Sequence, residues 1–326
     1  MKTALVTGAN GFIGSFLVER LIKEGFDVRC FVRETSNLRW IKDLPVKFYY
    51  GALLEPETLV EPLKDVEYVF HTAAKKRAFA EAEYNEVNHF GTLNLLEACK
   101  NAGSIKRFIY VSSLAVTGPN PKEKPWTEDA PCNPISFYGS SKLKGEEDVR
   151  KYNSFFPVTI IRPPAVYGPR DTDLLPIFKA VKWGIKPKLG IRKRIMSIVY
   201  VDDLIGAISH SSQSEVASGK TYFVCSKNYY PYDEIVERIS FNLNKRAISI
   251  KIPSPLIYVA AFINQVFARI RGKAAVLNIQ KAGEMTKRFW ICSPNKIEKE
   301  LGIVAKTSLD EGIKKTIDWY KSNKYL

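Results

Sequence analysis

The stretch "TGANGFIG", Thr7 to Gly14, decides which fold the rest of the sequence is expected to adopt. The apolar run "KTALV" precedes it and "SFLVERLIKEG" follows with apolar residues at helical spacing, so the local order is strand, glycine turn, helix. Glycines there allow a sharp turn and let backbone N–H groups approach a pyrophosphate at the positive end of a helix. The stretch therefore predicts a dinucleotide site formed by Gly8, Gly11, Phe12, Ile13 and Gly14.

The alternation of strand-like and helical segments continues to about residue 225. Runs of strand-forming residues occur at "DVRCFVR", "VKFYYG", "VEYVFHTAA", "IKRFIYVSS", "PVTIIRPPAVYG" and "KTYFVC", and helical stretches such as "NHFGTLNLLEACKNAG" separate most of them. This order predicts the α/β class, with a doubly wound parallel (Rossmann) sheet that binds ligands at the carboxyl ends of its strands. We expect an NAD(P)-binding domain at 1–168, to which 197–226 returns, and a smaller, mostly helical substrate-binding lobe at 169–196 and 227–326.

The end of the second strand bears on which dinucleotide binds. An acidic residue at this place would bind the ribose 2′-hydroxyl of NAD, whereas an arginine suits the 2′-phosphate of NADP. The strand ends at Arg33, Glu34 follows it, and Ser36 adds a hydroxyl donor. Arg33 and Ser36 favour NADP, and Glu34 keeps NAD open.

A second motif, "YGSSK", places Tyr138 and Lys142 four residues apart with only Gly and Ser between them. One turn of helix would bring both side chains onto the same face. An ammonium beside a phenol favours the phenolate and lowers the pKa of the phenol. The spacing thus fits an acid/base pair, and an ordinary exposed helix start is the alternative.

Composition and cysteine usage are typical of a globular protein from a reducing compartment. The 326 residues are 45% hydrophobic and 25% charged, and the five cysteines form no CxxC pair or metal-spaced cluster. Neither an apolar leader nor a run of roughly 20 apolar residues is present. We expect a cytoplasmic protein without a metal, either soluble or at most peripheral to a membrane.

The net charge of +15 is higher than usual. The segment 177–196 contains seven Lys or Arg and no acid, and 269–288 contains six against Glu284 alone. Such patches attract nucleic acid, an anionic membrane or an anionic small molecule, or they form a solvated basic face. The bases are not interleaved with a repeated aromatic pattern, and no nucleic-acid module is evident, so we expect no nucleic-acid partner.

One segment near the basic patches is strongly amphipathic. Wound as a helix, "SPLIYVAAFINQVFARIRGK" places a set of large apolar residues on one face: Leu256, Val259, Phe262, Ile263, Val266, Phe267 and Ile270. This face fits a helix packed on the protein's own core. It also fits a lid over an apolar substrate or a surface that meets an anionic membrane.

Across nearly its whole length the chain resembles the extended short-chain dehydrogenase/reductases of the epimerase/dehydratase type. The motifs that carry the resemblance are "TGANGFIG", "HTAA", "VNHFGT", "IYVSS", "YGSSK", "RPPAVYGPRD", "YVDDL" and "LGIVAKTSLDEGIKKTIDWY". The arginine after the second strand and "RFWICSPNKIEKELG" are more similar to the dihydroflavonol-reductase and 3β-hydroxysteroid-dehydrogenase branch.

The resemblance implies roles for individual residues. Tyr138 would be the acid/base, Lys142 would lower its pKa and bind the nicotinamide ribose, and Ser113 would polarise the substrate oxygen. Asn88 of "VNHFGT" would support the site, although a helix cap fits it equally well. The resemblance also implies a set of cofactor-lining residues: Leu53, Thr72, Ala73, Ala74, Pro163 and Val166. Leu53 is included because Ala52 occupies the position at which many relatives have an adenine-binding Asp, so that adenine contacts would rely on the backbone near Leu53. Asp203 of "YVDDL" would be a structural helix cap.

The departures from the family pattern narrow the chemistry that the resemblance implies. Leu114 and Ala115 occupy the positions at which the dehydratases carry an acidic pair. Met196 lies near the position at which the nucleotide-sugar epimerases usually carry an arginine. We therefore expect an enzyme that reduces a bulky or lipophilic ketone or aldehyde with NADPH. A nucleotide-sugar epimerase with bound NAD, and a non-catalytic NADP-binding regulator, are the alternatives. The resemblance also implies a homodimer.

Overall fold

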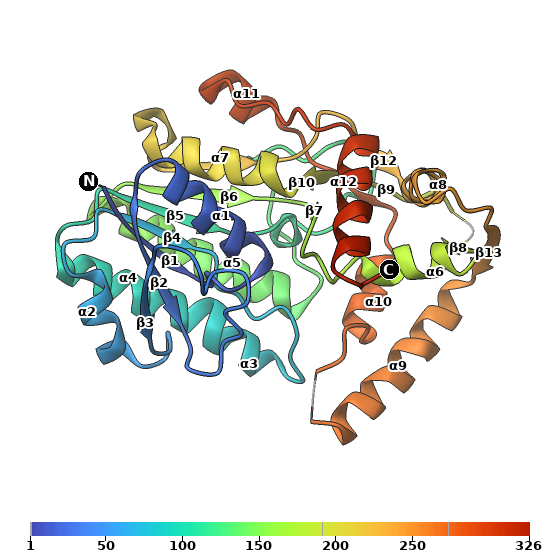
Figure 1. Ribbon diagram of the computed structural model, residues 1–326, viewed down its shortest axis with the longest axis horizontal. Helices are drawn as coiled ribbons and strands as arrows, with labels where there is room; N and C mark the ends of the chain where they lie inside the picture. Colours follow the sequence, from blue (N-terminus) through green and yellow to red (C-terminus); the bar gives the residue numbers. More distant parts are fainter. Residues whose placement is uncertain (1, 191, 273) are drawn as a thin grey trace.

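The centre of the computed structural model is a seven-stranded parallel sheet (Figure 1), and the structure describes residues 2–190, 192–272 and 274–326. Across the sheet the strands follow the order β11-β6-β5-β4-β1-β2-β3. Their bounds are β1 Thr3–Thr7, β2 Asp27–Val32, β3 Lys47–Tyr50, β4 Tyr68–His71, β5 Arg107–Val111, β6 Val158–Arg162 and β11 Lys220–Phe223. The chain order reverses between β1 and β4, which is where such sheets bind ligands. The predicted doubly wound sheet is confirmed.

Helices cover both faces of this sheet. Helices α1 (Phe12–Lys23) and α7 (Val201–Gln213) pack on one face, and α4 (Gly91–Ala102) and α5 (Phe137–Lys151) pack on the other. Side chains alternate between the two cores, so that in β1 Ala4 and Val6 face the first pair of helices and Leu5 faces the second. Because both faces of the inner strands are buried, those strands are mostly apolar, whereas the edge strand β3 is partly exposed.

The run 157–168 differs from the expected single strand. The structure divides it into β6 and a separate strand β7 (Ala165–Tyr167), which leaves the main sheet and pairs with β10 (Ile198–Tyr200). Pro163 and Pro164 stand between β6 and β7. A proline has no N–H to donate to a sheet ladder, which explains the break at this place.

The C-terminal lobe is mostly helical, as expected. Its helices are α6 Leu175–Lys182, α8 Tyr232–Asn242, α9 Ser254–Ile270, α10 Ile279–Thr286, α11 Asn295–Leu301 and α12 Leu309–Ser322. Two small sheets accompany them, β8 (Ile185–Leu189) with β13 (Ile248–Ile252), and β9 (Ile195–Met196) with β12 (Tyr230–Pro231) and β14 (Phe289–Trp290). The remaining elements are short: α2 Val60–Leu63, α3 Glu81–Asn85, a π-helix η2 at Glu86–Phe90, and the 3-10 turns η1 Pro56–Leu59, η3 Leu114–Val116, η4 Tyr152–Ser154 and η5 Glu215–Ala217.

One hydrophobic core runs from the sheet into this lobe through α12. Tyr320 is fully buried in the same cluster as α1 and α7, and its hydroxyl donates to the carbonyl of Asp171 at 2.6 Å. The Trp319 ring lies 5.4 Å from that of Trp40, which follows β2. The two-domain division given above stays a proposal, because the core it would divide is continuous.

Asp203 does not cap its own helix. Its carboxylate accepts the backbone N–H groups of Lys306 and Thr307, both at 3.1 Å, and so fastens the segment before α12 to α7. In the described residues, no helix is long and apolar enough to cross a membrane, and no group of His, Cys, Asp or Glu has metal-binding geometry.

Candidate active site

The glycine turn between β1 and α1 is closely packed. Gly8 has φ +69°, and a Cβ on it would lie 2.7 Å from the backbone nitrogen of Ala73. A Cβ on Gly14 would lie 2.1 Å from the carbonyl oxygen of Gly8. Since real Cβ atoms do not approach backbone this closely, both positions require glycine.

The first turn of α1 is prepared for an anion. Gly11 is its N-cap, no side chain caps it, and the first turn contains no acidic residue. The leading backbone N–H groups, including those of Phe12 and Ile13, therefore have no acceptor within the helix. A diphosphate group fits this position, because the positive end of the helix dipole attracts it.

The turn after β2 orders the residues expected to bind the adenosine ribose. The Arg33 N–H donates to the Ser36 hydroxyl at 3.1 Å, and the Ser36 N–H donates to the Arg33 carbonyl at 2.9 Å. Arg33 and Glu34 are both exposed. Leu53 is buried nearby on the chain after β3, and its carbonyl accepts from the Asn94 amide at 2.9 Å.

A buried chain of hydrogen bonds crosses the sheet beneath the glycine turn. The Thr92 hydroxyl donates to the Asn88 carbonyl at 2.9 Å and so accepts from His71 Nε2, also at 2.9 Å. His71 Nδ1 then accepts from the Thr7 hydroxyl at 2.6 Å, and the Thr7 oxygen accepts from the Ala73 N–H at 3.4 Å. Burial, and second the charge of Lys142, hold the pKa of His71 well below its ordinary value. This neutral relay fixes the backbone at Thr72 and Ala73 relative to Asn88.

Asn88 lies in the π-helix η2, fully buried, and is not a helix cap. Its side-chain oxygen accepts the Lys75 N–H at 2.7 Å, and its amide donates to the Lys75 carbonyl at 3.0 Å. The same amide donates to the Ser141 hydroxyl at 2.9 Å, which in turn donates to the carbonyl of Tyr138. Asn88 therefore holds the strand-end loop beyond Ala74 against the helix that carries Tyr138.

Tyr138 and Lys142 lie one turn apart at the start of α5, as the spacing predicted. Ser136 caps this helix by accepting the N–H of Gly139 at 3.2 Å. A Cβ on Gly139 would lie 2.6 Å from the Ala115 carbonyl, so the small residues between Tyr138 and Lys142 let α5 approach the chain after β5. Ser113 belongs to that chain and has extended backbone.

The structure brings Ser113 into contact with Tyr138. The Ser113 oxygen accepts the Ala115 N–H at 3.1 Å, and Ser113 is near enough to the Tyr138 hydroxyl to affect its pKa. Burial, and second the charge of Glu284, raise the pKa of Tyr138 well above its ordinary value, and Ser113 opposes this only in part. Lys142 is not among the groups that shift this pKa, so its expected effect on Tyr138 stays a prediction.

The side chain of Lys142 is fully buried. Its Nζ lies 3.9 Å from the centre of the Tyr110 ring and forms no hydrogen bond to any residue that the structure describes. Burial lowers the pKa of Lys142 to about 7, and Glu146 one turn further along α5 opposes the shift. An unpaired buried amine is a costly arrangement that a ligand hydroxyl would relieve. The residues present thus fit a dinucleotide ribose.

Sequence reasoning missed the ion pair that supports this helix. Glu146 is fully buried and accepts two bonds from Arg162 at the end of β6, at 2.8 and 2.6 Å. Although burial works in the opposite direction, Arg162 keeps the pKa of Glu146 below its ordinary value. The spacing of Tyr138, Lys142 and Glu146, each four residues from the next, was the available signal.

The acidic surroundings of Tyr138 were also missed. Glu284 of α10 pairs with Lys281 at 3.0 Å, and Asp173 pairs with Lys76 at 2.7 Å and with Arg77. Their segments lie far from Tyr138 in sequence, so no local pattern indicates them. The α10 residue Gln280 also accepts the backbone N–H of Phe137 at 2.9 Å. Helix α10 therefore forms part of the wall beside Tyr138.

The two remaining predicted residues follow β6. The Pro163 carbonyl accepts the Leu114 N–H at 2.8 Å, which joins this segment to the chain that bears Ser113. Val166 is half-buried in β7. The carboxyl ends of β1, β4, β5 and β6 thereby meet around Tyr138 and the glycine turn.

Known proteins resemble the chain over most of its length. A family model described as "NAD dependent epimerase/dehydratase family" matches residues 4–225. The ceramide reductase of Caulobacter vibrioides is 29% identical over 322 residues, 98% of this chain and 95% of the relative. The sterol-4-alpha-carboxylate 3-dehydrogenase (decarboxylating) of Bos taurus is 32% identical over 265 residues, 77% and 73% of the two chains. The fold is shared with the UDP-glucose 4-epimerase of Thermus thermophilus, solved with NAD, at a TM-score of 0.79 and 23% identity over 98% of this chain and 99% of that chain.

Proposed function

The chain belongs to the NAD-dependent epimerase/dehydratase family and is an NAD(P)-dependent oxidoreductase of the extended short-chain dehydrogenase/reductase type, and on this premise we propose that it reduces a bulky, lipophilic ketone or aldehyde with NADPH. The observation that carries the proposal is the pair Ser113 and Tyr138. Gly139 lets the start of α5, which carries Tyr138, approach the chain that carries Ser113, and burial raises the pKa of Tyr138 so that the phenol keeps its proton. A protonated phenol can give a proton to a carbonyl oxygen, which is what reduction requires.

In this reaction the chain's own groups act on the substrate oxygen. The Ser113 hydroxyl would donate a hydrogen bond to the carbonyl, and Tyr138 would transfer its proton to that oxygen as the carbonyl becomes an alcohol. Lys142 would bind the nicotinamide ribose, which gives its buried amine the partners it lacks. NADPH, when bound, supplies the hydride for the carbonyl carbon. Solvent would then reprotonate Tyr138.

Several observations support the finer parts of the proposal. The exposed Arg33 at the end of β2 suits a 2′-phosphate, which favours NADPH over NADH. Leu114, which is buried, and Ala115 carry no acidic side chain. The two residues directly after Ser113 therefore offer no acid or base for removing water from a sugar. The names of two relatives, a ceramide reductase and a sterol dehydrogenase, agree with a lipid-like substrate. We also keep the homodimer implied by the family as a proposal.

The test is to follow NADPH consumption with a panel of ketones and aldehydes of increasing chain length. Tyr138→Phe should lower turnover at least about 10²-fold, the lower range for loss of a positioned acid. Cofactor binding should survive in this variant, because the glycine turn and Lys142 remain. Tyr68→Phe is the matched control, since Tyr68 lies at the opposite, amino end of β4.

Other results would replace the proposal. Tightly retained NAD with no net turnover would favour an epimerase. Tight NADP binding with no turnover of any carbonyl would leave a binding regulator. Normal turnover in Tyr138→Phe would remove Tyr138 as the acid.

A further inference from the structure

Helix α9 exposes its large apolar residues to solvent. It extends from the end of β13 along the outer side of the C-terminal lobe (Figure 1). Of its side chains, Phe262 is 58% exposed, Phe267 56% and Ile270 76%, and four more apolar residues are at least 43% exposed: Leu256, Val259, Ile263 and Val266. The alternative that this face packs on the protein's own core is therefore wrong.

A narrow seam on another side of α9 attaches the helix to α10. Ile257 and Ala261 are buried there against Ala282. Hydrogen bonds from Tyr258 to Thr286, at 3.1 Å, and from Asn264 to the Leu277 carbonyl, at 2.9 Å, support the seam. At 100° per residue, the exposed apolar side chains span about 140°, roughly two-fifths of the helix circumference. A contiguous apolar surface of this size marks an interaction site.

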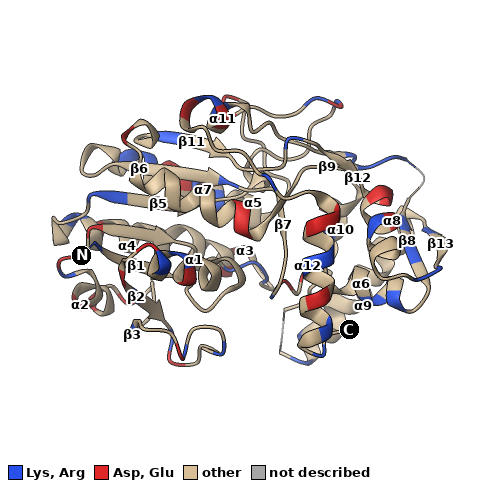
Figure 2. Ribbon diagram, turned by 45° about the horizontal axis from the view of Figure 1, so that its top comes forward, with Lys and Arg blue, Asp and Glu red and all other residues tan. Residues whose placement is uncertain are grey.

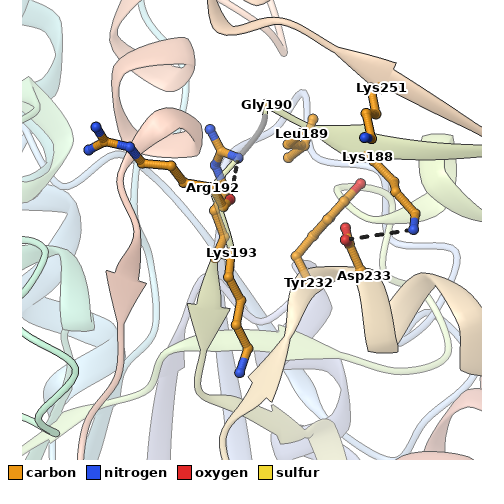
Figure 3. Close-up of a pocket in the computed structure, with 9 residues that line it drawn as sticks. Lys188, Leu189, Gly190, Arg192, Lys193, Tyr232, Asp233 and Lys251 are labelled. Atoms are coloured by element: carbon orange, nitrogen blue, oxygen red, sulfur yellow. Dashed lines mark hydrogen bonds and ion pairs between the residues drawn. The ribbon is translucent and has the colours of Figure 1, made fainter.

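A basic pocket adjoins the start of α9 (Figure 3). It has a volume of about 210 Å³, and Asp233, paired with Lys188 at 4.0 Å, is the one acid among the described residues that line it. A second hollow continues from it to the first turn of α9, with Pro253, Ser254 and Arg288 in its wall. The basic residues that line the first pocket are Lys188, Arg192, Lys193, Arg194 and Lys251.

Basic residues lie at both ends of the apolar face. Arg269 and Arg271 follow it as exposed side chains, and the sequence from 238 to 283 contains no Asp or Glu. Figure 2 shows Lys and Arg along β8 and β13, near the start of the helix. The apolar surface is thus framed by positive charge.

From these observations we propose that α9 docks in the interface of an anionic lipid bilayer, with its apolar face among the acyl chains and the basic pocket on lipid phosphates. A bilayer offers hydrocarbon and negative charge side by side, which matches both parts of the surface. Helix α9 has 17 residues, and Asn264, Gln265 and Arg269 interrupt its apolar sequence, so it lies in the interface and does not cross the bilayer.

The same hairpin reaches the candidate active site. Helix α10, on which α9 packs, carries Glu284 beside Tyr138 and Gln280 on the first turn of α5. Arg194 joins the basic pocket to this helix by donating to the Met285 carbonyl at 3.0 Å. The docked face and the catalytic phenol therefore share one structural unit. This part of the inference rests on the proposed function: the carbonyl substrate would be a membrane lipid.

Vesicle flotation tests the docking without any catalytic readout. The full chain is mixed at low salt with vesicles of phosphatidylcholine, alone or with phosphatidylglycerol. We expect binding to need phosphatidylglycerol and to weaken as salt rises. Phe262→Asp/Phe267→Asp should abolish binding. Arg192→Glu/Lys193→Glu should weaken it at least about 10-fold, since each base near an anionic surface contributes about 1 kcal/mol.

Matched controls separate the surface from general effects of charge. Lys64→Glu/Lys220→Glu changes the net charge equally, far from α9, and should retain most of the binding. Phe241→Asp removes an aromatic residue that is 81% exposed on α8 and should also bind. Thermal melting of each variant shows that it is folded. A wild-type chain that stays unbound with both vesicles overturns the proposal, as does equal binding of the α9 variant. A dimer that α9 substitutions convert to monomers, without vesicle binding, would assign the face to a second copy.

The substrate part has its own readout. The ratio of turnover on a ketone lipid held in anionic vesicles to turnover on a short soluble ketone should fall at least about 10-fold in the α9 variant. Vesicle binding with an unchanged ratio would refute delivery from the bilayer while leaving docking intact. Absence of turnover on either substrate would instead refute the proposed function.

Discussion

Lys142 is a residue whose proposed role in the site lowers the stability of the folded protein. Its amine is buried over the Tyr110 ring without a hydrogen-bond partner, and burial lowers its pKa to about 7. An unsatisfied buried polar group costs roughly 1–3 kcal/mol, and more when it is charged. Sites that need such groups are less stable than they could be.

We therefore expect Lys142→Met to stabilise the ligand-free protein by roughly 1–3 kcal/mol while abolishing turnover. The folded-state pKa of Lys142 lies below its ordinary value of 10.5, so burial destabilises the protein fully below about pH 7 and progressively less as pH rises towards 10.5. The gain should shrink over that window. Denaturant unfolding at several pH values measures it, with Lys144→Met as control, since the Lys144 side chain is 41% exposed and its amine has a partner in Asn85. Equal stability of the two variants at pH 7 would contradict the cost assigned to Lys142.

The candidate pair itself was predictable at this scale because Tyr138 and Lys142 lie in one helical turn, where spacing alone fixes their proximity. Their electrostatics were not predictable. Burial raises the pKa of Tyr138 most, and Glu284 and Asp173, which raise it further, come from distant segments that only the tertiary fold brings near. The Tyr110 ring under Lys142 likewise belongs to a distant segment, strand β5.

At the scale of elements, the turn between β1 and α1 tolerates no side chain at two of its glycines. Gly14→Ala would place a Cβ 2.1 Å from the Gly8 carbonyl oxygen. We expect this variant to lose dinucleotide binding and stability together. Gly206→Ala is the matched control, since nothing lies within 4 Å of a Cβ there and the position is inside α7. It should stabilise the protein by about 0.5–1 kcal/mol. Calorimetry and cofactor titration compare the two; equal effects would show that the close approach does not matter.

The turn after β2 should set the choice of dinucleotide. Arg33→Glu removes the partner proposed for a 2′-phosphate, and a hydrogen bond to a charged group contributes about 1.5–3 kcal/mol. NADPH affinity should fall about 10- to 100-fold relative to NADH affinity. Lys23→Glu at the end of α1 should leave that ratio unchanged. If Arg33→Glu has no effect on the ratio, Glu34 contacts the ribose instead.

The strands of the main sheet were predictable because each is a local apolar run bounded by turn residues. Two features were not. The apolar run 157–168 gave no sign that the chain leaves the main sheet at Pro163 and Pro164. The apolar stripe of α9 did not indicate whether the protein's own core or another surface covers that face. A stripe fixes which side chains share a face, whereas the partner of that face depends on chain segments elsewhere.

At the scale of the whole molecule, α12 joins the two lobes through a shared hydrophobic core. Tyr320 is fully buried in the core shared with α1 and α7, and Trp319 contacts Trp40. We expect a single unfolding transition in urea, with coincident curves by tryptophan fluorescence and far-UV circular dichroism. Tyr320→Ala should lower the midpoint strongly, since truncating a buried aromatic residue costs about 3–5 kcal/mol. Two separate transitions would show that the lobes fold independently.

The relay from Ala73 through Thr7, His71 and Thr92 to Asn88 also limits which substitutions this sequence can accept during evolution. Only one order of donors satisfies it, with every hydroxyl giving its hydrogen in the same sense. A mutation that replaces the imidazole leaves two buried hydroxyls facing a group of the wrong kind. Descendants of this sequence should therefore replace Thr7, His71 and Thr92 as a set, so that lineages carry either all three or none.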